Sequence, residues 1–290
     1  MYNGIINIYK ERGFTSNDVV QIVKRLTKSK AGHTGTLDPQ ATGVLPICLG
    51  KATKIADYIM GADKQYIAKV VLGSATDTQD AHGNVIEQSE KRAEQPEILL
   101  ALEQFLGEIS QIPPMFSAIK VGGKRLYEQA RMGVEVERKQ RQITISNLEV
   151  ARWDLDATPQ TFVLRVDCSK GTYIRTLCHD LGEILGTFAH MGELLRTKSG
   201  NFMLDDAITL GKLKKLAESG GLENIIMPME SALAHLPKIT MNIDSQKYIE
   251  NGNKLEFGQC LVFDHKGSLA GIYHSDGTHL RPKTMLLTKE

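Results

Sequence analysis

The chain has few cysteines, no long apolar run and almost no net charge, and each absence argues against a class of protein. Its four cysteines among 290 residues form no C-x-x-C pair, which argues against a disulfide framework. No stretch approaches the roughly 18 consecutive apolar residues of a membrane-spanning helix. The first residues carry neither the basic stretch nor the apolar core of a signal peptide. We therefore expect a globular protein of a reducing, cytoplasmic setting, with no membrane partner.

The net charge is +1, from 35 lysines and arginines against 34 acidic residues, and by itself it does not indicate nucleic acid. Binding depends on local patches, however, and both signs of charge cluster along this chain. The basic cluster comprises Lys24, Arg25, Lys28, Lys30, Lys51, Lys54 and Lys64. The acidic cluster comprises Asp77, Asp80, Glu87 and Glu90. A solvated helix face would explain the basic cluster as well as an RNA surface would, so charge leaves both interpretations open.

Hydrophobic patterns predict an α+β domain. Strands are predicted at residues 5–9, 66–72 and 161–168. A helix with apolar residues from Val19 to Leu26 is predicted after the N-cap chemistry of Thr15-Ser16-Asn17-Asp18, and further helices are predicted at residues 51–60, 97–106 and 174–184. The last helix has an apolar stripe of Ile174, Leu177, Leu181 and Ile184. Because strands and helices mix without a steady βαβ rhythm, the sequence favours α+β over a doubly wound fold.

Two further segments have a distinct composition. Residues 31–46 are rich in Gly, Thr and Pro and are expected to form an ordered loop. After Pro237, short strand-like pieces are predicted at residues 238–241, 260–263 and 269–273. The turns between them are predicted at Asn251-Gly252, Lys266-Gly267 and Asp276-Gly277. This tail is predicted to form a small β domain.

The loop from Gly32 to Gly43 is informative because it displays a single carboxylate, that of Asp38. It is not a phosphate loop, since the spacing of Gly43 and Gly50 does not fit G-x-x-x-x-G-K-S/T, and no dinucleotide fingerprint is present. Pro39 disfavours an α conformation at Asp38. A carboxylate held in this way suits covalent or proton-transfer chemistry, but an aspartate can also merely close its own turn. Local sequence leaves both roles open.

Arg175 falls in the first turn of the predicted helix 174–184, where a cation meets the positive end of the helix dipole. A residue that breaks a local rule without evident gain tends to mark a functional site. An arginine beside Asp38 would keep the carboxylate ionised and lower its pKa below ~3.9. A surface arginine without a function is the alternative interpretation.

A series of motifs in one order resembles the family of bacterial tRNA pseudouridine synthase B. The first is G-H-T-G-T-L-D-P-x-A-T-G-x-L-P at 32–46, followed by K-A-T-K at 51–54, D-K-Q-Y at 63–66 and T-D-T-x-D-A-x-G at 76–83. The later motifs are P-M-F-S-A-I-K at 114–120, G-K-R-L-Y at 123–127 and S-K-G-T-Y-I-R at 169–175. One departure is Glu11, because the family usually has proline after the lysine that matches Lys10.

The resemblance implies a pseudouridine synthase fold, with a mixed, largely antiparallel central sheet flanked by helices and a small C-terminal β domain. Residues 1–237 correspond to the catalytic domain, which contains a thumb-like RNA-binding insertion at about 114–140. Within this thumb, Gly122-Gly123 offers a hinge, and we expect the segment to be mobile without RNA. Residues 238–290 resemble a short PUA-like RNA-binding domain.

The resemblance also implies the chemistry. Asp38 corresponds to the essential aspartate of pseudouridine synthases, Arg175 to the arginine that pairs with it, and Tyr66 to the tyrosine that packs on the target uracil. The reaction breaks the N1–C1′ bond, rotates the uracil and rejoins it through C5. It requires no metal and no organic cofactor, and the eight histidines and four cysteines show no metal-ligand spacing.

The implied partner is tRNA, bound through its T-stem-loop, by a protein that we expect to be a monomer. Its uridine 55 is shielded by stacking and must be flipped out before the glycosidic bond can be reached. The expected RNA contacts are His33, Lys64, Lys120, Lys124, Arg125, Arg138 and Arg141. Two alternatives are a pseudouridine synthase that acts on another RNA and a non-catalytic tRNA-binding or tRNA-folding protein. The joint presence of Asp38, Tyr66 and Arg175 favours catalysis.

Overall fold

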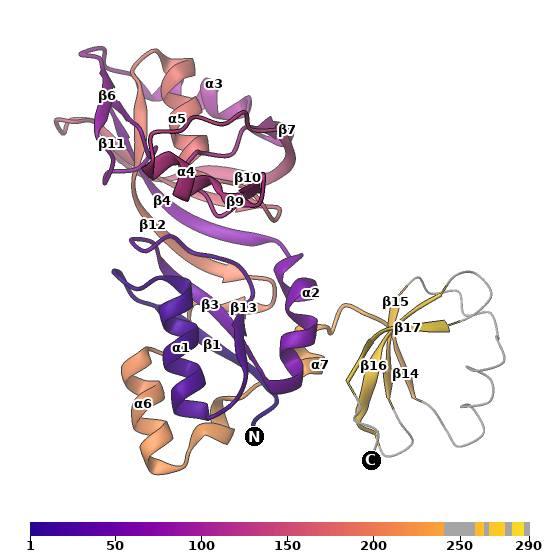
Figure 1. Cartoon of the computed structure of the whole chain (residues 1–290). Helices are drawn as coiled ribbons and strands as arrows, with labels where there is room; N and C mark the ends of the chain where they lie inside the picture. The colour runs from indigo at the N-terminus through magenta and orange to yellow at the C-terminus, as the bar shows by residue number, and fades with distance from the viewer. Residues whose placement is uncertain (241–258, 264–266, 276–279, 287–290) are drawn as a thin grey trace.

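The central element of the protein is a long mixed sheet (Figure 1). The computed structural model describes residues 1–240, 259–263, 267–275 and 280–286. The strand order is β1 (Gly4–Lys10), β3 (Thr42–Leu49), β12 (Ala189–Ser199), β4 (Lys64–Leu72), β11 (Thr161–Cys168), β10 (Arg141–Asp154) and β7 (Gly107–Gln111). The β3–β12 pair is parallel and the other neighbouring pairs in this order are antiparallel. The expected mixed, largely antiparallel sheet is confirmed.

Helix α1 (Ser16–Thr27) forms where the sequence predicts it. The Thr15 hydroxyl accepts a hydrogen bond from the Asp18 N–H, and the Asp18 carboxylate accepts one from the Thr15 N–H, which together form a capping box. The buried valines, Val19 and Val23 among them, lie on one face. This helix contacts α6 (Leu210–Ser219) beside β1 and β3 (Figure 1). It thereby supports the segment that follows β2 (Ala31–His33).

Helix α5 (Ile174–Leu185) packs on β12 and β4 and on α3 (Gln95–Glu103). Its predicted stripe holds at its first three positions but fails at the fourth, since Ile184 is 46% exposed. Leu185 is buried instead, because the residue four positions after Leu181 also lies on the same helical face. Arg175 does lie in the first turn, as predicted.

Several expectations about element boundaries were wrong. The segment 31–46 is not all loop, since β2 and the first half of β3 occupy its two ends, and β2 pairs with the last three residues of β3, Ile47–Leu49. The helix predicted at 97–106 begins and ends earlier, because Glu94 and Glu97 form a capping box at its start. The helix at 51–60 begins as a 3-10 turn, η1 (Gly50–Ile55), before α2 (Ala56–Met60).

The thumb segment is built on a short hairpin. Strands β8 (Lys120–Val121) and β9 (Lys124–Arg125) pair, and α4 (Leu126–Arg131) follows directly. Gly122 and Gly123 have φ values of 60° and 83°, the left-handed backbone that a two-residue hairpin turn requires. This glycine pair therefore forms the tip of a hairpin, which replaces the interpretation of the pair as a hinge.

The small C-terminal β domain is confirmed. Its sheet order is β14 (Lys238–Thr240), β15 (Gln259–Phe263), β16 (Leu269–Ser275) and β17 (Leu280–Met285), of which β17 was not predicted. Leu261 and Ile272 share an apolar cluster with Ile55 and Ile59 of the large domain. The predicted turns at Asn251-Gly252 and Asp276-Gly277, and Lys266 of the third, lie outside the described residues.

The remaining elements complete the large domain. Strand β13 (Phe202–Met203) pairs with β12, and β5 (Ser74–Thr76) pairs with β6 (Val85–Gln88). The short helices η2 (Leu222–Ile225) and α7 (Met229–Ala232) precede the C-terminal sheet. Within the described part of the chain, every helix is too short or too polar to cross a membrane.

Candidate active site

Asp38 is displayed by the segment between β2 and β3, and α1 holds that segment in place. The backbone N–H of Leu37 donates to the Ser16 hydroxyl at 2.8 Å, and the same hydroxyl donates to the Leu37 carbonyl at 3.1 Å. Leu37 itself is buried in the core. The side chain of Asp38 is 38% exposed. The anchored leucine thus presents the next residue, a carboxylate, to solvent-accessible space.

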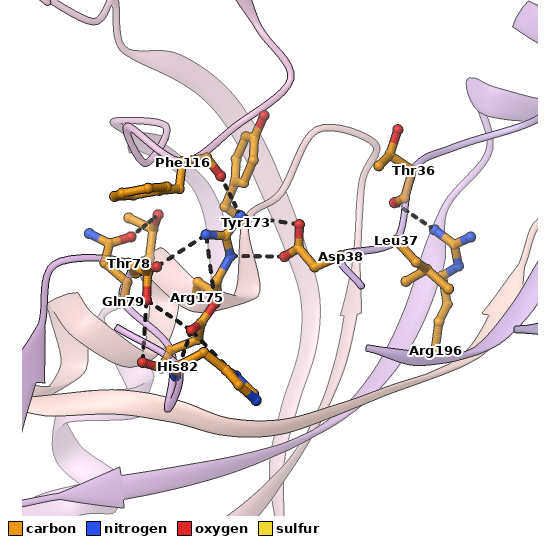
Figure 2. Close-up of polar contacts among 12 residues, drawn as sticks. Thr36, Leu37, Asp38, Thr78, Gln79, His82, Phe116, Tyr173, Arg175 and Arg196 are labelled. Atoms are coloured by element: carbon orange, nitrogen blue, oxygen red, sulfur yellow. Dashed lines mark hydrogen bonds and ion pairs between the residues drawn. The ribbon is translucent and has the colours of Figure 1, made fainter. Parts of the chain in front are cut away.

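The guanidinium of Arg175 joins three motifs that are far apart in the sequence (Figure 2). Its Nε lies 2.9 Å from Oδ2 of Asp38, and its Nη2 lies 3.3 Å from Oδ1, so the pair is bidentate. The remaining N–H groups donate to the carbonyls of Thr78 at 3.1 Å and Phe116 at 2.8 Å. Its side chain is only 5% exposed. Arg175 is therefore a buried partner of Asp38 and not an idle surface arginine.

Asp80 lies behind this pair as a second carboxylate. Its Oδ2 is 3.9 Å from Nη1 of Arg175. The turn that carries it is closed by the hydroxyl of Thr78, which donates to Oδ1 at 2.8 Å, and by the N–H of His82, which donates to the same oxygen at 2.9 Å. The arginine thus lies between two carboxylates, and its orientation toward Asp38 is fixed from both sides.

The pKa of Asp38 moves in the direction opposite to the prediction. Burial penalises the ionised form and raises the pKa above its ordinary value, and the charge of Asp80 adds to the rise. Arg175 and Lys10 oppose this shift, but they do not reverse it. The expectation that the arginine would bring the pKa below its ordinary value is therefore wrong, because it left desolvation out.

A cavity of about 330 Å³ opens beside the carboxylate. Its size falls in the range of sites that hold small ligands or a single base. It brings together residues from the 34–43 loop, β4, β12, the thumb and the start of α5: Gly35, Asp38, Lys64, Tyr66, Ile119, Tyr173, Arg175, Leu194 and Arg196. All three residues predicted to be catalytic line this one space.

Tyr66 and Lys64 enter the cavity wall from alternate positions of β4. Tyr66 is 8% exposed, and burial raises the pKa of its hydroxyl, while the charge of Arg196 acts in the opposite direction. Lys64 is also buried, and its amine donates to the carbonyls of Met60 and Ala62. Burial lowers the pKa of Lys64 to about 8. Lys64 is thus part of the cavity wall and not an exposed cation.

The other expected RNA contacts differ in exposure. Lys120, Lys124, Arg125 and Arg141 are exposed. Arg138 is half-buried and donates to the Pro113 carbonyl at 3.2 Å, which ties the end of the thumb to its start. His33 is half-buried, its Nδ1 accepts from the Gly35 N–H at 3.3 Å, and burial lowers its pKa. The contacts of these side chains with RNA stay predictions.

Two buried cations at the site were not among the predicted site residues. Lys10 donates through its amine to the carbonyls of Glu11, Phe14 and Pro39 at 3.1, 2.7 and 3.0 Å. Burial lowers the pKa of Lys10 to about 8. The departure at Glu11 therefore leaves the strand end fixed, because the lysine binds both sides of this turn. Arg196 is the second such cation, and its sequence context on β12 gave no motif that could have identified it.

The fold and this site define the class of protein. Its fold matches a chain in the "Crystal Structure of a Cbf5-Nop10-Gar1 Complex" with a TM-score of 0.73 and 29% identity over 98% of this chain and 85% of that chain. It likewise matches a chain in the "Structure of H/ACA RNP bound to a substrate RNA containing 2'-deoxyuridine", with a TM-score of 0.72 and 26% identity over 98% and 85%. The protein is a pseudouridine synthase by fold.

The family follows from the sequence comparisons. A model described as TruB family pseudouridylate synthase (N terminal domain) matches residues 23–174, and one described as tRNA pseudouridylate synthase B C-terminal domain matches residues 175–234. The tRNA pseudouridine synthase B of Bacillus pumilus is 48% identical over 100% of this chain and 99% of its own. That of Haemophilus influenzae is 43% identical over 98% and 95%. The chain belongs to the TruB family of pseudouridylate synthases.

Proposed function

We propose that this enzyme converts the T-loop uridine of tRNA, at position 55, to pseudouridine, with Asp38 as the essential catalytic residue. The observation that carries the proposal is the bidentate pair of Asp38 and Arg175 at the edge of a base-sized cavity that also contains Tyr66. The relatives at 48% and 43% identity bear the name of tRNA pseudouridine synthase B. A binding protein alone would not need a buried arginine to orient a carboxylate.

The reaction is an isomerisation, so no atom is gained or lost. The N1–C1′ bond of the uridine breaks, the uracil turns within the cavity, and a new bond forms between C5 and C1′. The hydrogen on C5 leaves as a proton, and N1 takes up a proton in exchange. The uracil is its own leaving group and returning nucleophile, and for this reason the chemistry needs no metal and no organic cofactor.

Each residue of the cavity has its own role in this proposed reaction. Asp38 faces the bond that breaks, and Arg175 keeps the carboxylate in a single orientation through two N–H donors. Tyr66 provides a flat face on which the uracil stacks, an interaction worth about 1–3 kcal/mol per base. Flipping the base costs a few kcal/mol, so stacking of this size offsets much of that cost.

The surface around the cavity supplies the specificity for tRNA. The thumb, residues 114–140, stands beside the site and is tied to Arg175 through the carbonyl of Phe116. Its exposed cations contact the phosphates of the T-stem-loop, while His33 contacts the splayed bases. The PUA-like domain, residues 238–290, adds a second RNA surface. The enzyme acts as a monomer in the cytoplasm.

The test is tritium release from tRNA that carries [5-³H]uridine, because loss of the C5 proton reports the isomerisation directly. Wild-type enzyme should release tritium from intact tRNA, whereas Asp38→Asn should bind the tRNA and release none. A tRNA with cytidine in place of the T-loop uridine should release none with either protein. Release from that control would assign the chemistry to another uridine. Tight binding by folded wild type without release would leave a tRNA-binding function instead.

A further inference from the structure

Arg196 has the largest side chain among those that the described part of the chain buries completely, and it lies beside the Asp38 loop. Its side chain is 1% exposed. Its Nε donates to the Val44 carbonyl at 2.7 Å, and its two terminal nitrogens donate to the carbonyls of Gly35 at 3.2 Å and Thr36 at 3.4 Å. Because these carbonyls flank Asp38 on both sides along the chain, one guanidinium holds both ends of the catalytic loop.

The backbone of Arg196 contacts the same loop. Gly43 has a φ of +108°, and a Cβ atom at this position would lie 2.2 Å from the carbonyl oxygen of Arg196. Only glycine allows so close an approach of the two chains. The register of the parallel pair, in which Gly43 is opposite Arg196, fixes this contact. The loop therefore meets Arg196 through its main chain as well as through its side chain.

The charge of Arg196 has no acidic partner within salt-bridge distance among the described residues. Its hydrogen-bond acceptors are neutral carbonyls. A buried cation without a carboxylate is costly, so a fold that only needed to anchor a loop would do better with neutral donors. The side chain lines the same cavity as Asp38 and Tyr66, and Figure 2 shows Asp38 between Arg175 and Arg196.

We propose that Arg196 is a positioning residue of the reaction, which fixes the Asp38 loop and gives the uracil cavity a permanent positive charge. The inference rests on the proposed function. When the N1–C1′ bond breaks, N1 keeps the bonding electron pair, and negative charge spreads over the uracil ring. The negative charge is removed when C5 bonds to C1′, and the later loss of the C5 proton is balanced by the proton that N1 gains. A cation already in place lowers the energy of this stage without reorganisation.

The influence of this charge extends over the site. Burial raises the pKa of Tyr66 and the charge of Arg196 opposes that rise, whereas burial lowers the pKa of His33 and the charge of Arg196 adds to that fall. Burial is the main cause that lowers the pKa of Lys10 and Lys64 to about 8, and the charge of Arg196 acts in the same direction. The two lysines show that burial lowers the pKa of an amine in this region. A lysine in place of Arg196 can therefore be discharged by raising the pH, which tests the role of the charge.

The experiment compares Arg196→Lys, Arg196→Gln and wild type in single-turnover tritium release at saturating tRNA. Arg165→Gln is the matched control, because Arg165 is a half-exposed arginine on β11 with its own ion pair to Glu149. Melting temperature and tRNA affinity are measured for each variant. We expect Arg196→Gln to lose about 100-fold in rate with unchanged affinity, the cost of removing one preorganised donor group. We expect the rate of Arg196→Lys to be about tenfold lower at pH 7, since lysine keeps the charge but lacks the planar guanidinium with its several N–H donors.

A pH profile separates charge from anchoring. Burial lowers the pKa of Lys10 and Lys64, so a buried lysine at position 196 should lose its proton at a lower pH than an exposed lysine, whereas arginine stays charged. The rate of Arg196→Lys relative to wild type should therefore fall between pH 7 and pH 9.5 toward that of Arg196→Gln. The proposal would be overturned if the ratio of the Arg196→Lys rate to the wild-type rate did not change with pH. Equal rates of the two variants at pH 7 would also overturn it. This readout needs only the lysine variant if the glutamine variant does not fold. Inactive wild type would refute the proposed function itself, and this inference with it.

Discussion

Arg175 donates to the Phe116 carbonyl at 2.8 Å while the same guanidinium lies 2.9 Å from Asp38, so the start of the thumb and the Asp38 carboxylate share one side chain. The segment that is expected to cover the RNA therefore begins at the group that orients the reactive residue. A shift of Phe116 would turn the arginine, and the arginine would turn Asp38. The geometry thus links the start of the thumb to the orientation of the Asp38 carboxylate through one residue.

Arg175→Gln should reduce both the rate and the stability. The variant leaves Asp38 without its partner and leaves the carbonyls of Thr78 and Phe116 without donors. Since each orphaned buried group costs about 1–3 kcal/mol, the free energy of unfolding should fall by roughly 2–4 kcal/mol. Urea denaturation measures this, with Arg165→Gln as a surface control that should change by less than about 0.5 kcal/mol. Equal stability of the two variants would contradict the assigned role of Arg175.

Tyr66→Phe tests the hydroxyl of the cavity wall apart from its ring. The ring stays in place for stacking, so the affinity for tRNA should change by less than about threefold. If the hydroxyl takes part in removal of the C5 proton, the single-turnover rate should fall by about 100-fold, in the range of general acid–base effects. Tyr66→Leu removes the ring as well and should weaken binding too. A phenylalanine variant as fast as wild type would limit Tyr66 to stacking.

The pH dependence of the rate should reflect the partly buried carboxylate of Asp38. Asp38 works as a carboxylate, and burial raises its pKa, so the ionised fraction is lost at a higher pH than for an exposed aspartate. Single-turnover rates should thus rise with pH through a limb that lies above the ordinary value of about 3.9. Because Arg175 lowers the pKa, Arg175→Gln should move the limb further upward. A wild-type limb at or below the ordinary value would contradict this.

The hairpin of the thumb should contribute to RNA binding mainly through charge. Lys120 and Lys124 are both exposed on its paired strands. The double variant Lys120→Gln/Lys124→Gln should lower the slope of log affinity against log salt by about 1–2, since each phosphate contact contributes roughly 0.7–0.9. The single-turnover rate at saturating tRNA should not change. Lys214→Gln, an exposed lysine on α6, serves as the control. An unchanged slope would place the thumb away from the phosphates.

The elements with a regular pattern could be predicted from the sequence, and those with an irregular pattern could not. The strand 161–168 has clean alternation and forms where predicted, as does the capped helix α1. Strand β12 was missed because its register shifts near Met191 and again near Arg196 interrupt the alternation of buried and exposed positions. Strand β10 has the same kind of interruption at two places.

Some features of the site could likewise be predicted from the sequence, and others could not. The family motifs point to Asp38, Tyr66 and Arg175, and these residues do line one cavity. The direction of the Asp38 pKa shift could not be predicted, because the sequence names the neighbouring charge but not the depth of burial. The buried state of Lys64 was missed for the same reason. Desolvation arises from tertiary packing, and no local pattern of residues encodes it.

The long separation of the residues that build this site has a consequence for synthesis. Thr36 and Arg196 are 160 positions apart, and they meet only when β12 has joined the sheet beside β3. At about 5–20 residues per second, the ribosome needs roughly 8–32 s to make the intervening chain. Until then the aspartate loop lacks the hydrogen bonds of Arg196. A nascent or truncated chain that ends before β12 therefore lacks the Arg196 anchor of the Asp38 loop and one wall of the cavity, so the complete site forms only late in translation.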